Sequence, residues 1–471
     1  MRLLVNYPVL LLLIAAGAIL SSAAPSYARS PTTLESSCAT LFNDNLEQTR
    51  TPSQSCTSRA SSRSETEAQI SRVINRAICD GKIKDAVVLI GNSKGVIYEK
   101  GFNTNSKIDV SYDLASLTKP IATATAVLKL VEESKGKIRL DDPISKHVPV
   151  LKGKGLDKVT IGDLLRHRAK IAEIDATSAN AWKGLSKDAA LDKAALIIAR
   201  ETREHKPQLE SFKYRDSAYV LLAELIQEKT GNYEGYVQNK ILKPLGMTQS
   251  RFKTTPGDKL ARSLKGSAGN AGLFSTAQDV ARFAQIFLTD KNPVLTPASV
   301  HLMTEATSED KSRFLNLLER LKIKSPTKFL MPGERPELHS AGFDLDPISL
   351  KGSFGEFSDK AFGHTGSSGT SLLIDPEKDI YVVVLTRNSM PTYTESQQKA
   401  SSAAMSKIRS QVAQAGLELV NPKTAQPMFS FCHFSSDRKV GQIRHFLDPE
   451  DTSPGAENSS AVSGISSRAE Q

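Results

Sequence analysis

Residues 113–120 read Asp-Leu-Ala-Ser-Leu-Thr-Lys-Pro and run directly into an apolar-periodic segment, Ile121 to Glu133. Ser116 stands where a helix N-cap belongs, because a serine there can accept hydrogen bonds from the N–H groups of the first turn. A nucleophile in that place meets the positive end of the helix dipole, and nearby N–H groups can hold an oxyanion. Lys119 follows three residues later, so both side chains project from one face. The stretch predicts a nucleophilic serine beside an amine.

The Ser-x-x-Lys spacing is not specific by itself. The chain is rich in both residue types, and the spacing recurs at Ser134 to Lys137 and at Ser325 to Lys328. Most such pairs are solvated helix faces. A serine hydroxyl is also a weak nucleophile until a base takes its proton, and a lysine can be that base only if burial or neighbouring cations lower its pKa. The role of Ser116 therefore depends on the rest of the chain.

Composition limits the class of protein. The chain has 471 residues, of which 39% are hydrophobic and 24% are charged, which allows a sizeable core in one large domain or two ordinary ones. The formal net charge is +10, but the lysines are scattered and aromatic residues make up only 6%. We therefore expect no nucleic-acid partner, and an anionic cell-envelope polymer suits this charge better.

The first 28 residues have the pattern of a signal peptide. Arg2 precedes an apolar run from Val9 to Leu20, and small residues end at Ala28. The alternative is a membrane anchor, but the run is short for a span and no second hydrophobic segment follows. We expect cleavage after Ala28 and an exported protein, periplasmic or extracellular, with no stable membrane span.

Four cysteines fit disulfides in an oxidising compartment, and they allow three pairings that the sequence leaves open: Cys38, Cys56, Cys79 and Cys432. None belongs to a Cys-x-x-Cys motif, and the eight histidines show no ligand spacing. We therefore predict no metal site and no cofactor. The oligomeric state is not readable from the sequence.

The order of expected elements predicts a sheet built from both ends of the chain, with a helical block between. The elements are a helix over 65–79 closed by Gly81, a hairpin over 86–99, helices over 159–167, 189–201, 217–230 and 276–288, strands over 371–375 and 380–386, and a helix over 396–415. Ser275 and Gln278 fit a capping box for the helix over 276–288. We divide the chain into a signal peptide (1–28), a flexible Ser/Thr-rich extension (29–64), a hydrolase domain (65–419, helical insert about 117–303) and a poorly ordered polar tail (420–471).

Two further segments can complete a site around Ser116. Residues 212–216 end in Tyr214-Arg215-Asp216 directly before a helix, where a tyrosine beside a lysine can act as general base and then as acid. Residues 363–370 read Gly-His-Thr-Gly-Ser-Ser-Gly-Thr before a strand, and N–H groups there can bind an oxyanion or a substrate carboxylate. The alternatives are a tyrosine at a core edge and a solvent-facing turn.

Together, Ser116 to Lys119, Tyr214 to Asp216 and His364 to Gly366 resemble the serine β-lactamase and penicillin-binding superfamily. The class C-like branch, with Tyr-x-Asn and Lys-Thr-Gly or His-Thr-Gly, is the closer match. Framework likeness at 160–167, 269–275 and 363–376 extends the resemblance over about residues 85–388. It implies an α/β (α+β) fold of β-lactamase/transpeptidase type, with an antiparallel sheet flanked by helices and an inserted, mostly helical subdomain.

The resemblance also implies roles for single residues. Ser116 would attack a carbonyl to form an acyl-enzyme, while Lys119 and Tyr214 move its proton. The backbone N–H groups of Ser116 and Ser367 would form the oxyanion hole. The remaining substrate-binding positions implied in this way are Asp216, His364, Thr365 and Gly366.

Two departures from the family pattern bear on the substrate. Asp216 stands where the branch has asparagine, and an ionised carboxylate only accepts hydrogen bonds. It can pair with Lys119, which would raise the pKa of that lysine and shift the base role to Tyr214. His364 replaces the lysine usual in β-lactamases, so a fixed cation for a β-lactam carboxylate is lost at neutral pH. Both departures favour D,D-peptidase-like or esterase activity over efficient β-lactamase activity.

We therefore predict an exported serine hydrolase that acts through an acyl-enzyme on a small-molecule ester or a D-Ala-type cell-wall peptide. The alternative is a catalytically inactive, penicillin-binding-like module that binds peptidoglycan or an envelope partner. The joint presence of Ser116, Lys119 and Tyr214 favours the enzyme, because a pure binder has no need of all three.

Overall fold

A computed structural model of the chain describes residues 62–105, 107–174, 182, 184–205, 213–254, 258–266, 268–308, 338–345, 357–389 and 394–422. All of them belong to one compact unit. The predicted signal peptide, nearly all of the predicted extension and the tail from residue 423 lie outside the described residues, and they remain predictions.

A five-stranded antiparallel sheet is built from both ends of the described chain, in the order β2-β1-β8-β7-β6. The strands are β1 Ile83–Asn92, β2 Gly95–Phe102, β6 Phe362–Thr365, β7 Ser371–Asp375 and β8 Ile380–Asn388. The central pair joins β1 to β8, with Ile83 opposite Asn388 at one end and Gly91 opposite Tyr381 at the other. The predicted antiparallel sheet and its two-ended construction are confirmed.

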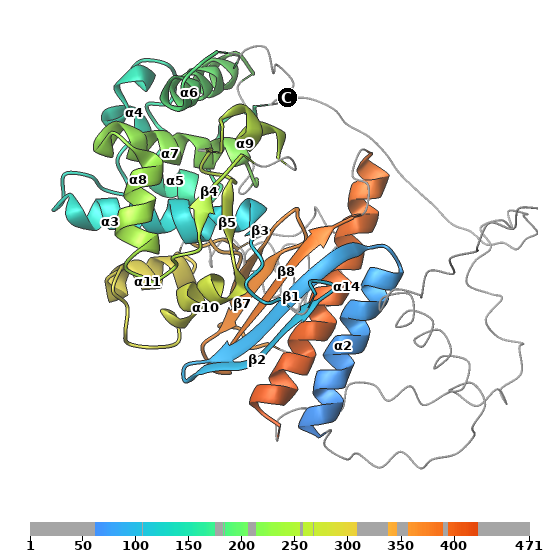
Figure 1. Ribbon diagram of the computed structural model, residues 1–471. Helices are drawn as coiled ribbons and strands as arrows, with labels where there is room; N and C mark the ends of the chain where they lie inside the picture. The colour runs from blue at the N-terminus through green and yellow to red at the C-terminus, as the bar shows by residue number, and fades with distance from the viewer. Residues whose placement is uncertain are drawn as a thin grey trace, which may run out of the picture. The chain divides into compact units, whose positions relative to one another are not determined.

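α2 (Arg63–Cys79) and α14 (Glu395–Val420) lie side by side across one face of this sheet (Figure 1). Ser62 accepts the N–H of Glu65, and the Glu65 side chain accepts the N–H of Ser62, which completes a capping box. Gly81 lets the chain leave α2 with φ +67°, as predicted. Cys79 is disulfide-bonded, and the three other cysteines lie outside the described residues.

The central strands are buried on both faces. Successive side chains of a strand point to opposite sides. In β1, Val87 and Leu89 belong to the core shared with the helical block, whereas Val88 and Ile90 belong to the core under α2 and α14. All four are fully buried. This two-sided burial explains why the strand reads as a continuous apolar run.

The other face of the sheet contacts α10, which belongs to the helical block between β3 and β6 (Figure 1). The block contains α3 Thr125–Glu133, α4 Ile144–His147, α5 Ile161–Leu165, α6 Lys187–His205, α7 Asp216–Thr230, α8 Tyr233–Val237, α9 Lys259–Ser263, α10 Ala277–Gln285 and α11 Pro297–Thr304. It also holds a small sheet, in the order β3-β5-β4, of β3 Tyr112–Asp113, β4 Arg251–Phe252 and β5 Leu273–Ser275. Strands of two or three residues are too short to show periodicity, so the sequence did not predict them. Throughout the described part of the chain, every helix falls short of the length or apolarity needed to cross a membrane.

The N-cap of α10 differs from the predicted one. Thr276, not Ser275, accepts the N–H of Asp279. Ser275 instead ends β5, opposite Tyr112, and its hydroxyl contacts the Ser250 hydroxyl. The predicted capping box was therefore wrong by one residue, because two adjacent hydroxyl residues fit the pattern and strand pairing commits the first of them to the sheet.

Candidate active site

Ser116 lies in the middle of a 3-10 turn, Ala115–Leu117, which leads through a π-helical turn over Lys119–Ala124 into α3. The prediction of Ser116 as a helix N-cap was wrong, because this turn has no side-chain cap hydrogen bond. Asp113 Oδ1 accepts the N–H of Ala115 at 2.9 Å, and Ala115 adopts φ +46°, which is rare for alanine. The Asp113 carboxylate thus fixes the backbone that enters the turn, and the Ser116 hydroxyl contacts Lys119 instead of capping the turn.

Lys119 is fully buried, and its ammonium group has three oxygen acceptors. Nζ donates to Asp216 Oδ1 at 2.6 Å, to Ser116 Oγ at 3.1 Å and to the backbone oxygen of Asn270 at 3.1 Å. An ammonium group has three N–H donors, and here each one has an acceptor. The surroundings of Lys119 are therefore arranged for its charged form.

Two opposing effects act on the pKa of Lys119. Burial disfavours the charged form and lowers the pKa, but the Asp216 carboxylate and the Tyr214 phenol together outweigh burial and hold the pKa above its ordinary value. The predicted pairing with Asp216, and the direction of its effect, are thus present in the structure. A lysine whose pKa is raised is a poor base at neutral pH, so Lys119 supplies positive charge to the site.

Tyr214 lies directly before α7, with its ring stacked on His167. The two ring centroids are 4.3 Å apart, with 27° between the planes. His167 also fixes the backbone on both sides of Tyr214, since its carbonyl oxygen accepts the N–H of Lys213 at 3.0 Å and its Nδ1 accepts the N–H of Arg215 at 3.1 Å. Because Nδ1 accepts, the proton of the neutral ring is on Nε2. One residue thus holds Tyr214 by three contacts.

The Tyr214 side chain lies beside both Ser116 and Lys119. Lys119 Nζ is 4.8 Å from the centre of the Tyr214 ring. Burial raises the pKa of the Tyr214 phenol, the Lys119 ammonium lowers it, the Asp216 carboxylate raises it, and the net pKa lies above its ordinary value. Tyr214 is nevertheless 39% exposed, so the site is open to solvent on this side.

β6 brings His364, Thr365 and Gly366 to the same place. The His364 ring centroid is 6.1 Å from that of Tyr214, and its Nδ1 donates to the backbone oxygen of Thr365 at 2.8 Å. Burial, reinforced by the charge of Lys119, lowers the pKa of His364 to about 3. The imidazole is therefore neutral at physiological pH, as the sequence predicted, with Nε2 as a hydrogen-bond acceptor.

A third imidazole, His339, completes a group of rings around Tyr214. Its centroid is 5.3 Å from that of His167 and 6.5 Å from those of Tyr214 and His364. Burial lowers the pKa of His339 to about 3 and holds the pKa of His167 well below its ordinary value. Tyr214 is thus surrounded by three neutral imidazoles. The described residues contain no cluster of His, Cys, Asp and Glu with the geometry to hold a metal ion.

Ser367, the second predicted oxyanion residue, is exposed in the turn over 366–370 that follows β6. The N–H of Gly366 donates to the backbone oxygen of Thr370 at 2.8 Å, which closes the turn. A Cβ atom at Gly366 would lie 2.7 Å from the backbone oxygen of Leu114, so glycine is required for this close approach. The turn is therefore packed against the residues that precede Ser116.

Two hydroxyl groups tie this turn to the chain before Ser116. Ser368 Oγ donates to the backbone oxygen of Asp113 at 2.7 Å, and Thr370 Oγ1 donates to that of Leu114 at 3.2 Å. These bonds join segments separated by more than 250 residues. They fix the distance between the backbone of Ser116 and the turn, as a two-part oxyanion hole requires.

Arg409, on α14, supports the same turn from the opposite side. Its Nη2 donates to the backbone oxygens of Thr370 at 3.1 Å and Gly366 at 3.4 Å. Arg409 is 7% exposed, its Nε has no partner, and no carboxylate among the described residues forms an ion pair with it. Burial lowers the pKa of Arg409 to about 10, so it still carries a charge at neutral pH. An uncompensated positive charge therefore lies behind the turn of Ser367.

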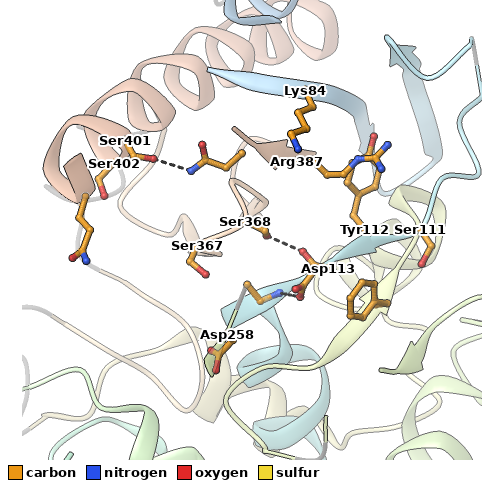
Figure 2. Close-up of a pocket in the computed structure, with 14 residues that line it drawn as sticks. Lys84, Ser111, Tyr112, Asp113, Asp258, Ser367, Ser368, Arg387, Ser401 and Ser402 are labelled. Atoms are coloured by element: carbon orange, nitrogen blue, oxygen red, sulfur yellow. Dashed lines mark hydrogen bonds between the residues drawn. The ribbon is translucent and has the colours of Figure 1, made fainter. Parts of the chain in front are cut away.

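A cavity of about 710 Å³ opens beside Ala115 and Ser367 (Figure 2). Its other walls are the segment 111–113, the end of β8 at 387–388 and the first turns of α14. The turn that carries Ser367 forms part of the cavity wall. It gives the site room for a sizeable part of a substrate.

The predicted site residues converge: Ser116, Lys119, Tyr214, Asp216, His364, Thr365, Gly366 and Ser367. Their chemical roles remain predictions. The sequence analysis did not identify His167, His339 or Arg409 as part of the site. His167 had a signal, since it ends the framework stretch 160–167, whereas His339 and Arg409 stand in no motif and reach the site only through tertiary packing.

A family model described as Beta-lactamase matches residues 65–403 of this chain. "Protein flp" of Staphylococcus aureus (strain N315) is 34% identical over 219 residues, which cover 43% of this chain and 42% of that protein. The match thus spans less than half the length of this relative. A protein of Escherichia coli (strain K12) named "Putative D-alanyl-D-alanine carboxypeptidase" is 25% identical over 360 residues, which cover 63% of this chain and 77% of that protein.

A solved structure gives a similar result. The octameric penicillin-binding protein homologue from Pyrococcus abyssi superposes with a TM-score of 0.54 and 26% sequence identity, covering 77% of this chain and 79% of that one. The similarity includes both the two-ended sheet and the helical block, because it extends over most of the described residues.

Proposed function

This chain belongs to the Beta-lactamase family, whose model spans most of it, and we propose that it is a serine hydrolase acting on ester or D-Ala-type cell-wall peptide substrates through an acyl-enzyme. One observation carries the proposal. Ser116 Oγ lies 3.1 Å from Lys119 Nζ, whose charge is balanced by Asp216 at 2.6 Å. A binding module gains nothing from burying an amine against a serine hydroxyl, because that burial costs free energy.

Acylation begins at Ser116 with Tyr214 as the base. Lys119 is protonated, so the proton acceptor is the Tyr214 phenolate, a minor form at neutral pH that the adjacent ammonium stabilises. As Oγ bonds to the substrate carbonyl carbon, the hydroxyl proton passes to the phenolate. The carbonyl electron pair moves onto oxygen, where the N–H groups of Ser116 and Ser367 stabilise it, each worth about 3 kcal/mol.

Breakdown of the tetrahedral intermediate returns the proton. The Tyr214 phenol gives it to the leaving oxygen or nitrogen as that bond breaks, which leaves an ester on Ser116. Water then repeats the sequence: Tyr214 takes its proton, the hydroxide attacks the ester carbonyl, and the phenol protonates Ser116 Oγ. Each half-reaction starts and ends with the same protonation state of Lys119.

Two residues support the substrate class. His364 is neutral, so β6 offers no fixed cation at this position for a β-lactam carboxylate. Asp216 is held by Lys119 and donates no hydrogen bond to a substrate carbonyl. Both features argue against efficient recognition of a β-lactam. The name of the Escherichia coli relative points the same way. We also propose export, on the pattern of the first 28 residues.

Active-site labelling tests this function. A fluorescent fluorophosphonate should label the wild-type chain and fail to label Ser116→Ala. Ser134→Ala is the matched control, because Ser134 and Lys137 have the same spacing away from the site, and this variant should label as the wild type does. Turnover of p-nitrophenyl esters, a chromogenic cephalosporin and a D-Ala-D-Ala peptide then ranks the substrates.

Two results of the labelling would contradict the proposal. Label retained by Ser116→Ala would place the nucleophile elsewhere. A folded wild-type chain that takes no label and turns over none of the substrates would favour the alternative of an inactive, peptidoglycan-binding module.

A further inference from the structure

The cavity beside Ser367 has opposite charges on its two sides. Figure 2 shows Lys84 and Arg387 on one side, Asp113 and Asp258 on the other, and Ser367 between them. A cavity that took only anions, or only cations, would not be expected to combine both signs in its lining. The arrangement matches a ligand group that is itself dipolar.

The basic side has one anchored cation and one cation free to pair. Arg387 makes two bonds to Asp85, Nε to Oδ1 at 3.0 Å and Nη2 to Oδ2 at 2.6 Å, and Asp85 also accepts the Tyr112 hydroxyl at 2.9 Å. Lys84 is exposed, and within the described residues it makes no ion pair. The charge of Arg387 is balanced by Asp85, so Lys84 supplies the surplus positive charge on this side.

On the acidic side, the Asp258 carboxylate accepts hydrogen bonds from one backbone donor and one side-chain donor. Asp258 Oδ1 accepts the N–H of Ala261 at 2.7 Å, and Oδ2 accepts Asn270 Nδ2 at 3.2 Å. Each carboxylate oxygen has a second lone pair, so Asp258 can still receive a ligand ammonium. Burial, with Asp216 and Asp113 nearby, raises the pKa of Asp258, the direction expected for a carboxylate that lacks a full counter-charge.

The acidic side is also the side nearer the nucleophile. The Lys119 ammonium acts on Asp258 by lowering the pKa of its carboxyl group. Asp113 Oδ1 accepts the N–H of Ala115, the residue before Ser116. Lys84 lies across the cavity from both (Figure 2). A ligand that spans the cavity would therefore place its cation closer to the scissile carbonyl and its anion farther away.

We propose that this cavity is a specificity subsite for a zwitterionic substrate end, one that carries an ammonium group toward Asp258 and a carboxylate toward Lys84. The inference rests on the proposed function and names the substrate class of the same site: amino-acid derivatives and peptides with a free amino-acid end. The about 710 Å³ of the cavity is ample for such a group.

A set of matched esters tests the subsite. Four acyl p-nitrophenyl esters of equal chain length end in a methyl group, an ammonium, a carboxylate, or both charges, and a second set carries the same ends on the leaving group. The measurement is kcat/KM at fixed ionic strength. In one of the two sets, the wild type should prefer the zwitterion over the methyl ester by about tenfold, as two partly exposed charge contacts allow.

Two variants assign the two ends. Lys84→Gln should lower the preference for the carboxylate by about threefold and leave the preference for the ammonium unchanged, whereas Asp258→Asn should do the reverse. Asparagine caps helices as well as aspartate does, so α9 keeps its N-cap. The matched control is Lys94→Gln, an exposed lysine between β1 and β2, which should leave all the ratios at their wild-type values.

The possible results separate the two proposals. Hydrolysis of the methyl esters with equal kcat/KM for all four ends in both sets would overturn the subsite and leave the hydrolase intact. Equal loss on every ester in Lys84→Gln would overturn it as well, because a specificity contact must discriminate. No turnover of any ester by the folded wild type would instead overturn the proposed function.

Discussion

Two buried cations lie on opposite sides of the segment 364–370, and the protein treats them differently. Lys119, at the nucleophile, has a carboxylate at 2.6 Å and a raised pKa. Arg409, on α14, has only backbone oxygens as partners within the described part of the chain, and burial lowers its pKa to about 10. Burying a charge without a counter-ion costs free energy that the fold must recover elsewhere. In the proposed mechanism, charge is thus balanced where protons would move and left unbalanced behind the turn where an oxyanion would form.

The largest effect should come from removing the balanced cation. Lys119→Met takes away the ammonium that stabilises the Tyr214 phenolate, and we expect kcat/KM for an ester to fall by about a thousandfold. Lys129→Met, on α3 and away from the site, should keep wild-type activity. A loss of less than about tenfold in a folded Lys119→Met variant would mean that the ammonium plays no part in activating Ser116.

Removing the unbalanced cation should have a smaller effect. Arg409→Met removes the side-chain donor to the backbone oxygens of Gly366 and Thr370 and loosens the turn of Ser367, so we expect kcat to fall by ten- to a hundredfold with little change in KM. Added guanidinium should restore part of kcat, and Arg409→Lys should be intermediate. If kcat falls only in proportion to the folded fraction measured by thermal melting, Arg409 is structural and the contrast with Lys119 disappears.

The counter-ion of Lys119 offers a finer test. Asp216 raises the pKa of both Lys119 and Tyr214, so Asp216→Asn should lower both. The activity of the wild type should rise with pH as the phenolate fraction grows, and in Asp216→Asn this rise should move about one unit to lower pH. Asp216→Glu keeps the charge and is the control. Superimposable pH–rate profiles for wild type and Asp216→Asn would remove Tyr214 as the base.

The smallest effect on activity is expected at Glu224, a buried acid on α7. It needs no counter-ion, because it keeps its proton. Burial, reinforced by Asp192, raises the pKa of Glu224 from 4.5 to about 9. The folded state holds this proton while the unfolded state releases it, so stability falls as pH rises between these values. Glu224→Gln should therefore stabilise the protein by up to about 4 kcal/mol more at pH 8 than at pH 5. Equal changes in melting temperature at both pH values would contradict the assignment.

The fold was largely predictable because its signals are local or ordered along the chain. The helical spacing of α2, the left-handed Gly81 and the hairpin of β1 and β2 each follow from a few adjacent residues. The three site motifs were also readable, since each directly precedes or follows a predicted helix or strand. Their convergence required the resemblance to a known family, because spacing alone does not bring Ser116 and Tyr214 together.

The parts that were missed depend on long-range packing. Nothing near Arg409 in sequence shows that its guanidinium reaches Thr370, and the three imidazoles around Tyr214 come from segments far apart in the chain. The N-cap of the Ser116 turn was misassigned for a local reason. The helical turns begin one residue before Ser116, at Ala115, so Ser116 lies inside the first turn, and a sequence pattern does not fix a helix start to one residue.

The pairing of β1 with β8 has a consequence for protein synthesis. A nascent chain acquires Ser116, Lys119 and Tyr214 early, but His364, the turn of Ser367 and Arg409 are made much later. Domains generally fold as units. Because β1 pairs with β8, the sheet cannot close around the helical block until β8 has been made. A nascent chain that stops before β8 therefore lacks part of the proposed site, which is assembled only after both ends of the sheet have been made and paired.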